Sequence, residues 1–220
     1  ATHPQILAGT GDCNSQYDVF GNFSRAITPN GTPSPHLQWD PTEQEIFDAI
    51  TDKRLDEDSM AVIPEGMTAR AFAAHVARER LRSAVPDVDT YCDAEINDSM
   101  YFTLFPNFHP WGAFNRINYR FRPAGTKVDE CIMECIYTED FEGDERPAPA
   151  EYIELGIDQE WTELIPVIGN LARVFHQDSF NLPKVQKGLE TFRADGLTLT
   201  KYQEVKIRHW HAMAERFIAN

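Results

Sequence analysis

The sequence contains little cysteine, few basic residues and no long apolar run, and each shortage excludes a class of function. Its four cysteines form no Cys-x-x-Cys pair and no Cys-x-His pair, so we expect no iron–sulfur cluster within the chain. No run of eighteen apolar residues is present, so we expect no transmembrane helix. The Gly-x-Gly-x-x-Gly fingerprint of dinucleotide-binding proteins is also missing, so the chain has no motif of its own for delivering electrons.

Basic residues are outnumbered by acidic residues, 20 to 35, which gives a formal net charge of −15. A protein that binds nucleic acid or an anionic membrane surface needs clustered lysine and arginine, so we expect neither partner. The acidity favours solubility and would also suit a basic electron-transfer partner. The first residues have neither the basic nor the apolar stretch of a signal peptide, and we therefore expect a cytoplasmic protein.

Length and composition indicate one domain that spans residues 1–220, and the order of its predicted strands and helices makes it α+β. Hydrophobic residues make up 42% of the chain and aromatic residues 11%, which is enough to fill a core. Alternating apolar residues predict strands at 16–28, with a bulge at Gly21, and at 101–105, 113–122 and 130–139. Cys131 and Cys135 lie an even number of residues apart in the last of these strands, and we expect them to be small core residues on one face rather than a disulfide.

Helices are expected on both sides of the strands in the sequence. The first begins after an Asp40 cap and runs through residue 50, and the charged stretch 52–58 after it is expected to be a solvated link. A second helix begins after a Thr68 cap and runs through residue 83. Residues 160–192 predict a helix in two pieces around Pro166 and Gly169, and residues 203–218 predict the closing helix.

The helix predicted in the stretch 173–189 carries an acidic residue on its apolar stripe. The stripe has three- and four-residue spacing and consists of Val174, Phe175, Leu182, Val185 and Leu189, which is typical of one buried helix face. Asp178 falls on the same stripe. A carboxylate in such a position must be paired, hydrogen-bonded or bound to a metal, because burying an isolated charge is too costly. Asp178 is thus a candidate for a structural hydrogen-bonding group or for a metal ligand.

Two neighbours of Asp178 bear on this choice. Pro183 cannot donate a backbone hydrogen bond and crowds the carbonyl of Ser179, so we expect the helix to bend just after Asp178. His176 lies two positions before Asp178, about 200° around the helix axis, and is expected to point away from it. His176 is therefore not a second ligand to a metal held by Asp178.

Motifs at both ends of the chain share a pattern with a known family. The chain opens with Thr2-His3-Pro4 and later contains Gln177-Asp178-Ser179-Phe180-Asn181-Leu182. Further matching stretches are Tyr101-Phe102-Thr103-Leu104-Phe105-Pro106-Asn107, Val185-Gln186-Lys187-Gly188-Leu189, Gln203-Glu204 and Ile207-Arg208-His209-Trp210-His211. With these motifs, essentially the whole chain resembles the C-terminal catalytic domain of the alpha (large) subunit of Rieske-type aromatic-ring-hydroxylating oxygenases.

The resemblance implies a fold, a metal and its ligands. The fold would be a helix-grip domain of the START/Bet v 1-like type, in which a curved antiparallel sheet surrounds a long C-terminal helix. The metal would be a mononuclear Fe(II) held by two histidines and one carboxylate, of which His3 and Asp178 are the two present in this sequence. The family's first iron-binding histidine would lie five residues before His3, so we expect the chain to be part of a longer subunit that also contains the Rieske [2Fe–2S] cluster.

The resemblance also implies a substrate, a pocket and partners. An aromatic small molecule and O₂ would react at the iron, and a ferredoxin and reductase chain would supply electrons. The complete enzyme would be a homotrimer or would include a beta subunit. The helix periodicity around the two ligands places the substrate-pocket residues at Leu7, Val174, Phe175, Asn181 and Leu182. If His3 and Asp178 bind one iron, their ligating atoms are expected within roughly 3–4 Å of each other.

Two other functions are compatible with the same sequence. A metal-free helix-grip module would bind an apolar small molecule, and a purely structural domain would use Asp178 only as a buried hydrogen-bonding group. The chain as given is expected to fold but to hold little iron and to show no turnover, because a ligand and the cluster are absent from it. The substrate and the reaction outcome, whether dihydroxylation, monohydroxylation or demethylation, do not follow from the sequence.

Overall fold

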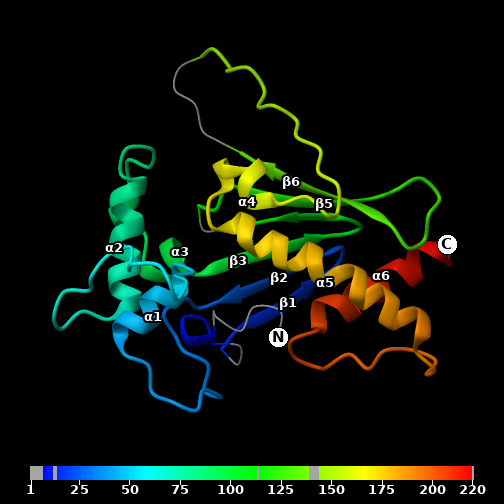
Figure 1. Ribbon diagram of the computed structural model, residues 1–220, viewed down its shortest axis with the longest axis horizontal. Coiled ribbons are helices and arrows are strands. Elements are labelled where there is room, and N and C mark those ends of the chain that lie inside the picture. The colour runs from blue at the N-terminus through cyan, green and yellow to red at the C-terminus, as the bar shows by residue number, and fades with distance from the viewer. Residues whose placement is uncertain (1–6, 12–13, 113, 139–143, 220) are drawn as a thin grey trace. The chain divides into compact units, whose positions relative to one another are not determined.

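The structure, a computed structural model, describes residues 7–11, 14–112, 114–138 and 144–219 (Figure 1). The chain divides into two compact units. The sheet unit consists of residues 5–138 and 198–220, and the helical unit consists of residues 1–4 and 139–197. The elements make an α+β protein with a six-stranded antiparallel sheet and a long C-terminal helix, which confirms the predicted class.

The strands of the sheet follow one another in chain order, so each strand pairs with its neighbour in the sequence (Figure 1). They are β1 (Gln16–Phe20), β2 (Phe23–Thr28), β3 (Ser99–Leu104), β4 (Phe108–Pro110), β5 (Ile117–Pro123) and β6 (Cys131–Tyr137). Every pairing is antiparallel. The pairing of β2 with β3 is the one that crosses a large distance in the sequence, because α1, α2 and α3 lie between them.

The predicted single strand 16–28 is wrong, because it is a hairpin. Phe20 pairs with Phe23, and the two residues between them, Gly21 and Asn22, form the turn. Gly21 has a φ of +35°, which a residue without a side chain adopts readily. Alternation of apolar residues continues across such a short turn, so the sequence pattern of a bent hairpin resembles that of one bulged strand.

The region around β4 and β5 also differs from the prediction. Strand β4, with three residues, was not predicted, because a run that short carries too little alternation to be recognised. The strand predicted at 113–122 begins at Ile117 instead. Phe114 has a φ of +58°, which is incompatible with an extended strand, and the Asn115 side chain accepts a hydrogen bond from the Ile117 N–H at 3.1 Å.

Strand register assigns the side chains to two faces. One face, called the α6 face from here on, carries the apolar residues Val19, Ala26 and Ile117. It also carries the polar and aromatic residues Tyr17, Ser24, Thr28, Tyr101, Thr103, His109, Tyr119 and Phe121. The opposite face carries Phe20, Phe23, Arg25, Leu104, Phe108, Arg120, Arg122 and Glu134. Glu134 binds both Arg120 and Arg122 there, and these hydrogen bonds lower the pKa of its carboxyl group to about 2.

The closing helix α6 (Val205–Ile218) packs on the sheet, which confirms the helix predicted at 203–218. A ring nitrogen of His209, Nε2, lies 3.1 Å from the Gly21 carbonyl oxygen at the β1–β2 turn. The indole N–H of Trp210 donates to the Pro106 carbonyl oxygen at 2.6 Å, at the β3–β4 turn. Met213, one turn further, is buried. The helix is thus fixed to two turns at the same end of the strands.

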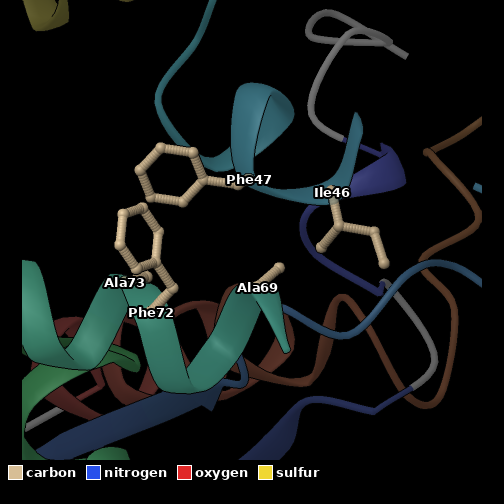
Figure 2. Close-up of a cluster of buried hydrophobic side chains, with 5 residues drawn as sticks. All are labelled: Ile46, Phe47, Ala69, Phe72 and Ala73. Atoms are coloured by element: carbon tan, nitrogen blue, oxygen red, sulfur yellow. The ribbon is translucent and has the colours of Figure 1, made fainter. Parts of the chain in front are cut away.

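Three helices between β2 and β3 form their own apolar core. They are α1 (Glu43–Ile50), α2 (Ala69–Leu81) and α3 (Asp93–Asn97). Figure 2 shows the α1–α2 contact, in which Phe47 and Phe72 face each other with ring centroids 5.0 Å apart. Five side chains make up this cluster, namely Ile46, Phe47, Ala69, Phe72 and Ala73, and all of them are buried. A second cluster of Ala74, Leu81, Val88 and Ile96 joins α2 to α3.

The caps of these helices are local hydrogen bonds. Thr68 caps α2 as predicted, since its hydroxyl accepts from the Ala71 N–H. The predicted Asp40 cap of α1 is wrong, because Thr42 is the cap and forms a capping box with Glu45. Proline is common at the first helical position, so the sequence points to Pro41 as the start and to Asp40 as the cap, whereas the helix begins two residues later.

A network of charged and amide groups joins α2 to the loop after β2. The Arg70 guanidinium donates two hydrogen bonds to the Asp98 carboxylate, at 2.6 and 3.1 Å, and a third to the Asn30 carbonyl at 2.6 Å. The Asn30 side chain in turn donates to the Asn97 carbonyl at 2.6 Å. Gly31 has a φ of +77°, and a Cβ there would lie 2.7 Å from the Arg70 Cα. This network fixes the helical segment to the start of β3.

Two smaller predictions were also wrong. Asp52, expected in a solvated link, is only 8% exposed and pairs with Arg54 at 2.7 Å. Cys131, expected as a core residue, is exposed because it is the first residue of β6, whereas Cys135 in the middle of that strand is half-buried. Both are free thiols, as predicted. Cys13 lies outside the described residues.

The helical unit contains α4 (Trp161–Leu164), the 3₁₀ turn η3 (Pro166–Ile168) and α5 (Leu171–Thr191). This order confirms the prediction of a helix in two pieces. Gly169, with a φ of +56°, lies between η3 and α5 and allows the chain to change direction there. Helix α5 has 21 residues and includes Pro183 within its length.

Candidate functional site

The candidate acidic ligand lies in the second turn of α5. Asp178 is half-buried and so are its predicted neighbours Val174 and Asn181. Phe175 is 2% exposed and packs on Trp161 of α4, with ring centroids 5.2 Å apart. The stripe is therefore covered where α4 packs against the first two turns of α5. Asp178 is not a surface carboxylate.

Further along α5 the predicted buried stripe is wrong. Leu182, Val185 and Leu189 are 53%, 47% and 42% exposed. The physical reason is the size of the helical unit, whose only other described helical elements are α4 and η3, and these are too short to cover five turns of α5. Of the five predicted pocket residues, Leu182 is thus the most exposed in its unit.

The remaining predicted site residues are not in the described part of the helical unit. His3 lies outside the described residues, so its distance from Asp178 stays a prediction. Leu7 belongs to the sheet unit, where it is half-buried in a 3₁₀ turn and its carbonyl accepts a hydrogen bond from the Ser34 N–H at 2.9 Å. Pro183 lies inside α5, and the bend expected after Asp178 stays a prediction. In the adjacent turn, the Lys184 ammonium donates to the Phe180 carbonyl at 2.8 Å.

His176 has a partner at the start of α4 rather than on its own helix. Its Nε2 lies 3.1 Å from a carboxylate oxygen of Glu160, the residue before α4. Its Nδ1 is buried and has no hydrogen-bond partner within the described ranges. The contact with Glu160 ties the start of α4 to α5.

The donor groups that the fold brings together decide whether the described residues could hold a metal ion. In the described residues, no group of three or more His, Cys, Asp or Glu side chains is arranged to hold a metal ion. Asp178 is the one predicted iron ligand within those ranges. The described residues alone therefore do not make a three-ligand iron site. None of the described helices, α5 included, is suited to span a bilayer.

A second group of polar side chains lies on the α6 face, and the sequence analysis did not identify it. Lys206, the second residue of α6, donates from Nζ to the Tyr101 carbonyl at 3.1 Å. The same nitrogen lies 4.4 Å from the centroid of the Tyr101 ring, which is a cation–π distance. His109, on β4, bonds Thr103 through Nδ1 at 3.2 Å. We call Lys206, Tyr101, His109 and Tyr17 the Lys206 cluster.

Burial dominates the electrostatics of the Lys206 cluster. It lowers the pKa of Lys206 to about 8 and raises the pKa of Tyr17 to about 12, because each charged form loses hydration. Burial, and after it the positive charge of Lys206, lowers the pKa of His109. The helix face that carries Lys206 is recognisable in the sequence, because Lys206, His209, Trp210 and Met213 recur at the spacing of one helix face. A charged residue on a buried helix face is also the pattern that identified Asp178.

A surface hollow of about 610 Å³ lies in the proline-rich loop before α1. It is lined by Pro33, Ser34, Pro35, Leu37, Gln38, Trp39, Asp40 and Pro41. The lining includes the exposed indole of Trp39, and Asp40 is its one ionisable side chain. This composition favours neither acid–base chemistry nor metal binding.

Comparisons of the chain with protein-family models, with curated proteins and with solved structures found no match.

Proposed function

We propose that this chain is the mononuclear-iron catalytic domain of a Rieske-type aromatic-ring-hydroxylating oxygenase, with a helix-grip fold. The observation that carries the proposal is the half-buried Asp178 on α5, within Gln177-Asp178-Ser179-Phe180-Asn181-Leu182, in a chain that opens with Thr2-His3-Pro4. The six-stranded antiparallel sheet and the long C-terminal helix α6 support the fold, because both are parts of a helix-grip domain.

The proposed iron would be held by Asp178, by His3 and by the histidine expected before Ala1. Two imidazoles and one carboxylate suit Fe(II) and, when the metal is bound, leave positions open for O₂ beside an aromatic substrate. The chain's own contribution is to hold one carboxylate in a half-buried position, where it stays fixed and partly desolvated. Phe175 and Trp161 pack together one turn before Asp178 and keep that part of α5 in place.

Val174 is the side chain through which the domain would select its substrate. It lies one turn before Asp178 on the same face of α5, and it is half-buried. Enlarging it to tryptophan would fill space next to the carboxylate without changing a ligand. In the complete enzyme, Val174→Trp is therefore expected to change the preference among aromatic substrates and to leave the iron content near normal.

The deciding experiment uses a longer chain that also carries the expected upstream histidine and the Rieske cluster domain. It is loaded anaerobically with Fe(II) and supplied with ferredoxin, reductase, O₂ and an aromatic hydrocarbon. Asp178→Ala is expected to lower bound iron and hydroxylated product by about tenfold or more, because one of three ligands is lost. Asp158→Ala removes an exposed carboxylate of the same unit and is the matched control.

An Asp178→Ala enzyme that keeps its iron and its turnover would refute the proposal. The second candidate function is a metal-free helix-grip module that binds an apolar small molecule. It would be favoured if the unaltered enzyme bound no iron but bound an aromatic compound saturably. One observation favours this second function, namely the aromatic side chains that line the α6 face, among them Tyr101, Tyr119 and Phe121.

A further inference from the structure

Lys206 has an incomplete set of partners for a lysine in its position. Its ammonium is half-buried and, in the described part of the chain, has one hydrogen-bond acceptor, the Tyr101 carbonyl oxygen, and no carboxylate within ion-pair distance. The nearest acid in the sequence is Glu204, and its carboxylate instead accepts from the Thr200 N–H. A cation removed from water normally has an anionic partner, because isolated charges are costly to bury.

The dipole of α6 increases this imbalance. Lys206 is in the first turn of the 14-residue helix α6, where the helix dipole is positive. His109 faces the same region, and the charge of Lys206 adds to burial in lowering the pKa of His109. A chain with a net charge of −15 thus contains a local site that favours an anion.

The surroundings of the ammonium are aromatic. The Tyr101 ring lies beneath Nζ and packs on Trp111, with centroids 5.4 Å apart, and Trp111 packs on Tyr119 at 5.9 Å. Two strands away from Tyr101 and level with it in the register, Tyr17 meets Tyr202 edge to face at 5.2 Å. The site therefore has a positive end and an aromatic wall.

A buried hydroxyl on the same face lacks a partner. Ser24 is fully buried, and within the described residues its Oγ makes no hydrogen bond. Ser24 pairs across the sheet with Thr103, whose hydroxyl bonds His109. A buried polar group without a partner is uncommon in native proteins and often marks a place that a ligand or water completes.

We propose that the Lys206 cluster binds an aromatic carboxylate, with the carboxylate paired to the Lys206 ammonium and the ring against Tyr101 and Trp111. The chemistry on both sides matches, because the ammonium lacks an anion and the wall is aromatic. The alternative is that Lys206 has only a structural role, in which its hydrogen bond to the Tyr101 carbonyl holds α6 to β3. That role leaves the positive charge without an anion. The proposal concerns the sheet unit and does not depend on iron at Asp178.

The test measures binding of sodium benzoate to the full chain by calorimetry and by Trp fluorescence. Lys206→Met keeps most of the side-chain volume and removes the charge, and it is expected to weaken benzoate binding about tenfold or more. Benzamide, which has the same ring without the charge, is expected to bind the unaltered protein about tenfold more weakly than benzoate does. Lys201→Met, at an exposed lysine of the same unit, is the control and is expected to bind benzoate as the unaltered protein does.

Equal benzoate affinity for Lys206→Met and the unaltered chain would overturn the proposal, as would the absence of saturable benzoate binding. If Lys206→Met does not fold, the decision comes from NMR titration of the lysine amines in the unaltered chain. Saturating benzoate is expected to raise the pKa of Lys206, because a paired carboxylate favours the charged amine. An unchanged Lys206 pKa in the presence of benzoate would refute the site.

Discussion

Removing the Lys206 charge is expected to change how stability depends on pH. Burial lowers the pKa of this amine from 10.5 to about 8 in the folded protein, whereas the unfolded chain keeps the ordinary value. Below pH 8 both states are protonated, and the folded state bears the full cost of burying a charge. Between pH 8 and 10.5 the folded state releases its proton while the unfolded state retains it, so the free energy of unfolding rises with pH.

The magnitude follows from the two pKa values. Raising the pH from 7 to 9.5 is expected to add about 2 kcal/mol to the free energy of unfolding, or about 1 kcal/mol if solvent screens the half-buried amine. Two acids act in the opposite direction. Burial raises the pKa of Cys135 to about 11 and, with neighbouring tyrosines, that of Tyr17 to about 12, so the unfolded state ionises first and stability falls above pH 9.

A comparison with Lys206→Met separates these effects, because both acids are present in both proteins. Urea denaturation of the two proteins is followed by circular dichroism at pH 7 and at pH 9.5. The difference in unfolding free energy between them is expected to shift by about 1–2 kcal/mol in favour of the unaltered protein as the pH rises. A difference that stays constant between the two pH values would mean that the Lys206 amine is not desolvated, and the reasoning would be refuted.

Three further predictions concern the fold. Asp98→Ala removes the carboxylate that Arg70 binds and is expected to cost about 2–3 kcal/mol in urea denaturation, whereas the exposed Asp58→Ala is expected to cost almost nothing. Thr42→Ala is expected to cost about 1 kcal/mol through loss of the α1 cap, and Asp40→Ala to be near neutral, so the reverse order would contradict the cap assignment. Glu134 is expected to titrate near pH 2 by NMR, and the stability that its arginine contacts provide is present above about pH 4.5 and lost as the pH falls to about 2. In Glu134→Gln the free energy of unfolding is expected to fall less between pH 4.5 and pH 2. An equal fall in the variant and the unaltered protein would contradict the assignment.

Elements that depend on local sequence were predictable. Helix α2 was found from its Thr68 cap and its periodicity, and the break before α5 was found from Pro166 and Gly169. Both signals act over a few residues, so tertiary packing does not change them. The turn at Gly21 was misassigned because a two-residue hairpin leaves the alternation on both sides almost intact.

The candidate sites depend on contacts between distant residues, and this limited the sequence analysis. Asp178 was identified from spacing along one helix, but the exposure of Leu182 depends on how much structure covers α5. The Lys206 cluster joins a helix after residue 204 to strands near residues 17 and 101, and sequence spacing does not show which strand the helix covers. Strand register and helix placement supply that information.

The pairing of β2 with β3 sets an order of events during synthesis. Seventy residues separate Thr28 from Ser99, so at ribosomal rates of about 5–20 residues per second the β1–β2 hairpin waits roughly 4–14 s for the next strand. The segment made in this interval includes α1, α2 and α3, whose cores contain no residue of the strands, so it is able to compact first. Helix α6 follows all six strands in the chain, so the aromatic face of the nascent sheet remains open to chaperones until α6 emerges.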